Sequence, residues 1–236
     1  MKQAENTKIA EDAKAFIKKK KRDLIDKFAD LEKFPPSEKP FSFFMAGSPG
    51  AGKTEFSKRL IESMMPTPIV RIDADEIKEF IPQYTGKNSD IVQGAASIAV
   101  DNLNYYALKH NQNLIMDGTF AHYGVARKNI MNCLNKKRQI SVFYIYQDPV
   151  VAWDFTRKRE KLEGRYVPKE AFIEAFFKAK ENVQLIKEEF GEKIELNLII
   201  KNDKNEDEEI KSNISSNIDD FAIIAYNKES LNTILC

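Results

Sequence analysis

Hydrophobic residues recur every three or four positions across residues 7–33, and this spacing predicts one long amphipathic helix. They are Ile9, Ala13, Phe16, Ile17, Leu24, Phe28 and Leu31. The opposite face carries the basic run 18–22, which is typical of a solvated helix face; a docking surface for an acidic partner is the alternative interpretation. A pair of prolines then ends the helix, because proline has no N–H to donate. Residues 1–36 are therefore predicted to form a charged N-terminal helix next to a domain of residues 37–236.

Five short apolar runs follow, and helical patterns separate them. The runs are predicted to be strands at residues 41–46, 68–72, 113–116, 139–146 and 194–200. The clearest helical patterns cover residues 55–64, 89–110, 151–162 and 169–189. Alternating strands and helices predict an α/β fold with a doubly wound, mainly parallel sheet of five to six strands. Residues 221–226 are the candidate for a sixth, edge strand, and the polar stretch 201–216 is predicted to be a loop or a short exposed element.

The composition excludes several classes of protein. Of the 236 residues, 42% are hydrophobic and 31% are charged, as in ordinary globular proteins, and the net charge of +1 does not favour a general nucleic-acid binder. No apolar run approaches the roughly 18 residues of a membrane span, and the N-terminus lacks the apolar core of a signal peptide. Cys133 and Cys236 are too few for a disulfide framework and are expected to be free thiols in a reducing compartment. We therefore expect a cytoplasmic protein that binds neither nucleic acid nor a membrane.

The strongest chemical signal lies between the first predicted strand and the helix after it. The pattern G-x-x-x-x-G-K-[ST] is matched by Gly47, Ser48, Pro49, Gly50, Ala51, Gly52, Lys53 and Thr54. Glycines let successive backbone N–H groups point at phosphate oxygens, and the following helix adds its positive end. Lys53 is expected to bind the β- and γ-phosphates and Thr54 to ligate Mg²⁺. A glycine-rich turn without a ligand is the alternative, which the strand–loop–helix context disfavours.

Two absent motifs favour a kinase over a GTPase switch. The guanine-binding pattern N-K-x-D is not matched where it is expected, since residues 201–204 read Lys-Asn-Asp-Lys. The third predicted strand runs into Asp-Gly-Thr-Phe at 117–120, so the switch pattern D-x-x-G is missing as well. The remaining prediction is an enzyme that transfers phosphate from ATP with Mg²⁺ as cofactor.

Carboxylates follow two of the predicted strands, at the edge where ligands bind in open parallel sheets. The second strand ends in Asp73 and Asp75. We expect Asp75 to accept the proton of the substrate hydroxyl and Asp73 to be structural, although either is suited to capping the next helix. The third strand ends in Asp117, close to Thr119. Asp117 is expected near Mg²⁺ or at the substrate, and a helix cap is the alternative.

Basic residues cluster after the fourth strand, in a region of about residues 154–168 that suits a lid over the phosphates. Arg165 lies in a break between two helical patterns. Arg157 and Arg159 are two positions apart, so they face different ways on a helix and at most one is expected to be catalytic. An ordinary charged helix surface is the alternative for each of them.

The chain resembles the zeta toxin family of bacterial P-loop kinases over about residues 41–200. Four blocks carry the resemblance in the family's order: the phosphate loop, Ile-Asp-Ala-Asp at 72–75, Met-Asp-Gly-Thr at 116–119, and Arg159 with Gly-Arg-Tyr-Val-Pro at 164–168. The resemblance implies P-loop kinase architecture and transfer of phosphate from MgATP to the 3′-hydroxyl of the N-acetylglucosamine unit of a UDP-sugar. It also implies a toxin that a small antitoxin protein restrains.

The resemblance assigns roles to further residues. Asp75 matches the general base, Asp101, Asp117 and Thr119 match substrate-binding positions, and Arg159 and Arg165 match the arginines that contact the nucleotide phosphates. Asp101 and Asp117 stand where the best-known members carry Glu, and the two arginines lie closer together than in those members. These differences keep another acceptor open, such as an antibiotic like chloramphenicol, a nucleotide or another metabolite. A nucleotide-dependent interaction protein without transfer activity, which recruits a partner through its basic N-terminal helix, is the remaining alternative.

Overall fold

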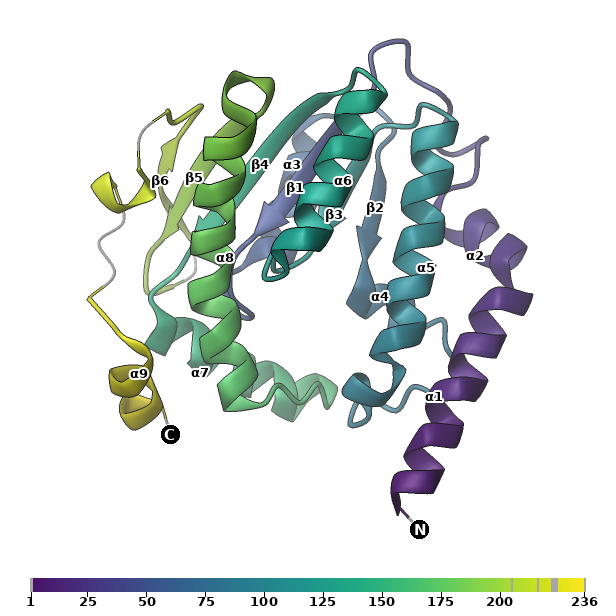
Figure 1. The fold of residues 1–236 in the computed structure, drawn as a ribbon, viewed down its shortest axis with the longest axis horizontal. Coiled ribbons are helices and arrows are strands. Elements are labelled where there is room, and N and C mark those ends of the chain that lie inside the picture. The colour runs from purple at the N-terminus through teal and green to yellow at the C-terminus, as the bar shows by residue number, and fades with distance from the viewer. Residues whose placement is uncertain (1, 205, 216, 222–224, 236) are drawn as a thin grey trace.

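The computed structural model describes residues 2–204, 206–215, 217–221 and 225–235. A six-stranded sheet runs through its centre in the order β2-β3-β1-β4-β5-β6 (Figure 1). Its strands are β1 Phe41–Ala46, β2 Val70–Asp73, β3 Leu114–Asp117, β4 Gln139–Tyr146, β5 Glu195–Lys201 and β6 Asp207–Lys211. The first five are parallel, and β6 pairs antiparallel with β5. The predicted doubly wound, mainly parallel sheet is confirmed.

Helices cover both faces of this sheet. They are α1 Lys2–Lys19, α2 Lys21–Phe28, α3 Lys53–Ser63, α4 Ala74–Lys78, α5 Ser89–Lys109, α6 Tyr123–Asn135, α7 Pro149–Glu163, α8 Lys169–Phe190 and α9 Lys228–Ile234. In Figure 1, α5, α6 and α8 lie in front of the sheet and α3 lies behind it. Strand β1 is buried on both sides, because Phe44 packs into the core in front while Met45 packs with Phe56 of α3. A strand covered on both faces needs apolar residues at successive positions, as β1 has.

The order of the strands brings the ends of three of them to one place. From β1 the chain crosses to β2, returns to β3 beside β1, and then continues to β4 on the other side of β1. The connections reverse direction at β1, and such a switch point leaves a crevice at the carboxyl ends of the strands. The register places Asp73 at the end of β2 directly opposite Asp117 at the end of β3.

The N-terminal region differs from its prediction. One helix was expected over residues 7–33, but the chain leaves helical geometry at Lys20, with φ −101° and ψ 26°, and forms α1 and α2. Both pack along α5 (Figure 1). Ala13, Ile17 and Leu24 are fully buried in the same hydrophobic cluster as α5 and the front of the sheet. The apolar stripe thus packs against the rest of the chain, while Lys18, Lys19, Lys21 and Arg22 remain exposed.

The sixth strand lies in the segment predicted to be a loop or a short exposed element. β6 forms there by pairing with β5, and its first residue has two basic partners: Asp207 accepts from Arg59 Nη2 and forms an ion pair with Lys201 Nζ, each at 2.6 Å. The edge strand predicted at residues 221–226 includes positions 222–224, which lie outside the described residues. Within the described part of the chain, no helix combines the length and apolarity needed to cross a bilayer.

Candidate active site

The phosphate-binding loop joins β1 to α3 and is shaped by positive backbone angles. Gly47, Gly50 and Gly52 have φ of 143°, 73° and 83°, a region that side chains other than hydrogen disfavour. A Cβ at Gly50 would lie 2.0 Å from the carbonyl oxygen of Ala152, so the close packing of α7 on the loop requires glycine as well. The first N–H groups of α3 have no partner within the helix and are suited to binding anions.

Lys53, the first residue of α3, is held inside this loop. Its Nζ donates to the carbonyl oxygen of Ser48 at 2.6 Å. Burial lowers the pKa of Lys53, and the carboxylates of Asp117, Asp75 and Asp73 oppose this shift only in part. A desolvated ammonium with too few counter-charges has a strong tendency to bind an anionic ligand.

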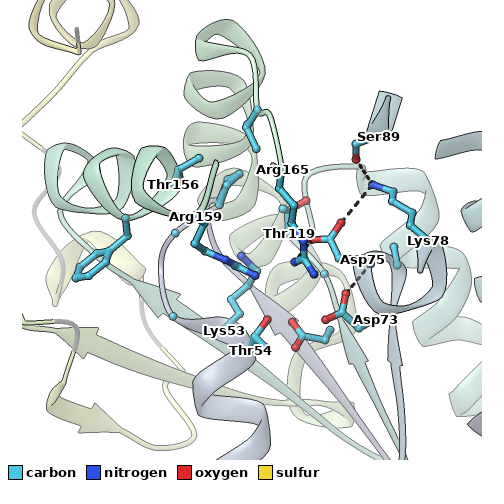
Figure 2. Close-up of a pocket in the computed structure, with 18 of the residues that line it drawn as sticks. Lys53, Thr54, Asp73, Asp75, Lys78, Ser89, Thr119, Thr156, Arg159 and Arg165 are labelled. Carbon is cyan, nitrogen blue, oxygen red and sulfur yellow. Dashed lines mark hydrogen bonds and ion pairs between the residues drawn. The ribbon is translucent and has the colours of Figure 1, made fainter. Parts of the chain in front are cut away.

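A cavity of about 660 Å³ opens above the loop and collects most of the predicted site residues (Figure 2). Its lining includes Pro49, Gly50, Gly52, Lys53, Thr54, Asp75, Asp117, Thr119, Arg159 and Arg165. Gly47, Ser48 and Ala51 belong to the loop but do not line the cavity. Asp101 lines an adjoining cavity of about 290 Å³, which shares Ala74, Gln93 and the segment after β3 with the first.

The two aspartates after β2 have different environments. Asp73 caps α4, since its Oδ1 accepts the backbone N–H of Asp75 at 2.8 Å. The Asp75 carboxylate accepts from Lys78 Nζ at 3.2 Å and from Arg165 Nη1 at 3.3 Å. Burial raises the pKa of Asp75, but the charges of Lys78 and Arg165 outweigh it, and the pKa is lowered. Burial, together with the nearby charge of Asp117, raises the pKa of Asp73 to about 6. Asp75 is therefore ionised at neutral pH and faces the cavity.

Sequence reasoning missed two basic residues that position these carboxylates. Lys78 lies one turn after Asp75 on α4, and its Nζ also donates to Ser89 Oγ at 2.7 Å. Arg71, inside β2, donates to Asp73 and Asp117, each at 2.6 Å. A cation in the middle of a strand that is otherwise apolar was the available signal for Arg71. The helical spacing of three between Asp75 and Lys78 was the signal for Lys78.

The three arginines of the predicted lid region lie differently. Residues 154–163 belong to α7, and residues 164–168 connect α7 to α8. Arg159 lines the cavity and reaches from α7 toward Lys53 (Figure 2), whereas Arg157 pairs with Glu160 and lies 5.7 Å from the centre of the Trp153 ring. The Arg165 guanidinium forms ion pairs with three carboxylates: Asp75 at 3.3 Å, Glu79 at 3.4 Å and Glu163 at 3.3 Å. Burial lowers the pKa of Arg165, but the nearby charges of Asp75 first and then Glu163 raise it overall.

The donor set beside the loop fits Mg²⁺. Thr54 and Asp117 line the same cavity, and oxygen donors are those that Mg²⁺ prefers. Asp117 accepts from Ser57 and Arg71 through Oδ2, and no described residue donates a hydrogen bond to its Oδ1. The described residues contain no group of three or more His, Cys, Asp or Glu side chains able to hold a metal by themselves. The protein would therefore supply part of a coordination shell that phosphates and water complete.

The pattern of one protein family matches most of this chain. The match to the zeta toxin model covers residues 25–214, from α2 past β6. The chain belongs to the zeta toxin family.

Solved structures share the fold of this zeta toxin family member. A chain of the PezAT chromosomal toxin–antitoxin system of Streptococcus pneumoniae superposes with a TM-score of 0.68 and 17% identity, covering 91% of this chain and 92% of that one. AvrRxo1-ORF1:-ORF2 with ATP gives a TM-score of 0.57 and 14% identity, covering 88% of this chain but 64% of that one. Curated proteins include no significant match. The fold is that of P-loop kinases, and the family supports a phosphotransferase that uses ATP.

Proposed function

We propose that this protein is an ATP-dependent kinase that phosphorylates a hydroxyl group of a small molecule. The observation that carries the proposal is one cavity that is lined by three basic residues, Lys53, Arg159 and Arg165, and by the ionised Asp75. Cations on one side suit a triphosphate, and a carboxylate facing them suits an acceptor hydroxyl.

The residues divide the chemistry among them. The loop N–H groups and Lys53 bind the β- and γ-phosphates, while Arg159 and Arg165 stabilise charge on the γ-phosphate. Thr54 and Asp117 would hold Mg²⁺, which neutralises phosphate charge when bound. The acceptor oxygen forms a bond to the γ-phosphorus, the bond from that phosphorus to the β–γ bridging oxygen breaks, and ADP leaves with the electron pair. Asp75 takes the hydroxyl proton.

A UDP-activated amino sugar such as UDP-N-acetylglucosamine is the first acceptor to test, because the chain belongs to the zeta toxin family. The purified protein is incubated with MgATP and UDP-N-acetylglucosamine, and the products are analysed by mass spectrometry. We expect one added phosphate on the sugar nucleotide. Asp75→Asn should lower transfer about 10³-fold, in the range of general-base contributions, while ATP binding stays nearly intact. Equal turnover by Asp75→Asn would contradict the assigned base.

The adjoining cavity favours a second class of acceptor. Apolar side chains make up much of its lining, among them Phe44, Ile72, Val100, Met116 and Phe120. Asp101, Asp117 and His122 are the titratable residues in that lining, and it includes no Lys or Arg. A neutral or cationic acceptor with an apolar body, such as an antibiotic, fits these groups better than a diphosphate does. The same assay with chloramphenicol and other neutral alcohols distinguishes the two classes.

We also propose that an antitoxin protein restrains this kinase. Among the structures with the same fold are a chain of the PezAT toxin–antitoxin system and the AvrRxo1-ORF1:-ORF2 complex. The exposed basic residues around Lys20 offer an acidic partner a surface that leaves the buried face of α1 and α2 intact. Expression in a bacterial host should slow growth through the kinase activity, and the Asp75→Asn variant should not. Equal growth inhibition by both proteins would contradict a toxic kinase.

A further inference from the structure

Arg71 is surrounded by charged and polar groups that belong to four elements: its own strand β2, β3, α3 and α4. Its Nη2 donates to Asp73 Oδ2 and Asp117 Oδ2, and its Nη1 donates to Glu76 Oε1 at 2.5 Å. Its Nε donates to Ser57 Oγ at 3.0 Å. The side chain is 9% exposed, so these contacts are made away from water, where charge-assisted hydrogen bonds are strong.

The contacts of Arg71 reach both halves of the proposed chemistry. On the acceptor side, Asp73 binds Arg71 with one oxygen and the N–H of Asp75 with the other. On the phosphate side, Ser57 donates to Asp117 Oδ2 at 2.9 Å. Ser57 lies on α3, three residues after Thr54, so it moves with the helix that begins at Lys53. One guanidinium therefore joins the turn that carries Asp75, the end of β3 and the phosphate-binding helix.

We propose that Arg71 is a positioning residue that fixes Asp117 and the Asp75 turn relative to the phosphate-binding helix. It occupies one oxygen of Asp117 and orients the other toward the cavity, where a phosphate-bound metal ion would need it. It also keeps two facing carboxylates together that would otherwise repel each other across β2 and β3. This inference rests on the proposed function, because it concerns the same site.

Arginine is suited to this role in a way that lysine is not. The four contacts of Arg71 use Nε, Nη1 and Nη2, which lie in one plane and point in fixed directions. A lysine ammonium at this position supplies the charge without the fixed geometry. Lysine should therefore restore only part of the effect of Arg71, whereas a role in charge balance alone would be restored in full.

The first test measures metal-dependent binding, which requires no acceptor. Calorimetry gives the Kd of a non-hydrolysable ATP analogue, with and without Mg²⁺, for the parent, Arg71→Gln and Arg71→Lys. We expect Arg71→Gln to weaken binding about tenfold with Mg²⁺ and less than twofold without it, as for residues that orient metal ligands from behind. The Kd of Arg71→Lys with Mg²⁺ should lie between those of the parent and Arg71→Gln.

Arg138→Gln is the matched control, because Arg138 is also a buried arginine but lies at the other end of the sheet. It should melt at a lower temperature and bind the analogue as the parent does. Ser57→Ala decides the question if Arg71→Gln does not fold, since it keeps the buried charges and removes the link to α3; we expect about threefold weaker binding with Mg²⁺. Three results would overturn the proposal. A folded Arg71→Gln could bind the analogue with parental affinity in Mg²⁺, or lose as much affinity without Mg²⁺ as with it. The third is a Ser57→Ala variant whose affinity in Mg²⁺ equals that of the parent.

A second readout uses the acceptor that the mass-spectrometric assay identifies. Arg71→Gln should lower kcat about 100-fold, since a displacement of about 1 Å in the reacting groups has this effect, and change the KM for the acceptor by less than threefold. A merely structural role would reduce the folded fraction and leave kcat per folded molecule unchanged. A parent that binds the analogue with Mg²⁺ but phosphorylates no acceptor contradicts the proposed function alone, because the binding readout still stands.

Discussion

Two arginines are buried at opposite ends of the parallel sheet, and their partners differ in kind. Arg138 precedes β4 and donates to Ser42 Oγ and to the carbonyl oxygens of Phe41 and Gln112, all of them neutral groups. Arg71 donates to three carboxylates and one hydroxyl near the carboxyl ends of β2 and β3. Burial lowers the pKa of Arg138, whereas the carboxylates around Arg71, Asp117 first, outweigh burial and raise its pKa.

This difference in partners distinguishes the amino ends of the strands, which serve the fold, from the carboxyl ends, which carry the candidate active site. At the amino ends, Arg138 satisfies backbone carbonyls where β1 starts, which is a task of folding. At the carboxyl ends, several charges of both signs are held together at a cost in desolvation, which folding alone does not require. Open parallel sheets bind ligands at their carboxyl ends, and the charges lie there.

The largest expected effect is at Lys53. Lys53→Met should lower phosphate transfer by more than about 10³-fold, because the charge that faces the phosphates is lost. Its stability should stay equal or rise, since the folded protein disfavours the charged form of this lysine. Steady-state kinetics and thermal melting check both parts. A lower melting temperature with unchanged turnover would break the distinction between the two ends.

A pH series sharpens the same distinction at Asp73. Its folded pKa of about 6 exceeds the ordinary value of 3.8, so the folded state binds this proton more tightly than the unfolded state. The stability from this group is present below pH 3.8 and is lost as pH rises through about 6. The loss is on the order of 3 kcal/mol, from 1.4 kcal/mol per pKa unit.

Asp73→Asn keeps the helix cap, because asparagine caps as well as aspartate, and should remove this part of the pH dependence. Urea unfolding between about pH 4 and pH 7 checks it, with the variant gaining on the parent as the pH rises. Asp75 is present in both proteins, so its lowered pKa does not affect the difference between them. A pH-independent difference in the free energy of unfolding between the two proteins would show that ionisation of Asp73 does not destabilise the folded state.

The smallest expected effect is at Arg138. Arg138→Gln should lower the free energy of unfolding by about 2 kcal/mol, because buried oxygens at the start of β1 lose their donor. Turnover per folded molecule should stay within about twofold of the parent, since Arg138 and its neutral partners lie outside the candidate active site. Urea unfolding and active-site titration of the same sample separate the two quantities. A large fall in kcat at full stability would show that the amino ends also control the chemistry.

Much of the fold could be predicted because the signals for it are local. The bounds predicted for β1 and β4 are those of the structure, and both strands are almost continuous apolar runs. β6 could not be predicted, because an acidic segment lacks the apolar pattern of a strand. It pairs with β5, and Asp207 contacts Arg59, 148 positions earlier in the chain, and Lys201 of β5. The bend at Lys20 likewise depends on how α1 and α2 pack along α5.

The candidate site shows the same division. The phosphate loop can be read from the amino-acid sequence alone, since a strand, glycines, Lys53 and Thr54 follow one another along the chain. The sequence also indicates that Asp117 ends a strand and that Asp75 follows one closely, because strand ends are visible in the pattern of apolar residues. By contrast, the packing of the folded chain places Arg159 rather than Arg157 in the cavity lining, and it lets Arg71 join β2, β3 and α3. Hydrophobic periodicity records which face of an element is buried, whereas the partner of a buried charge is set by the packing of elements far apart in the chain.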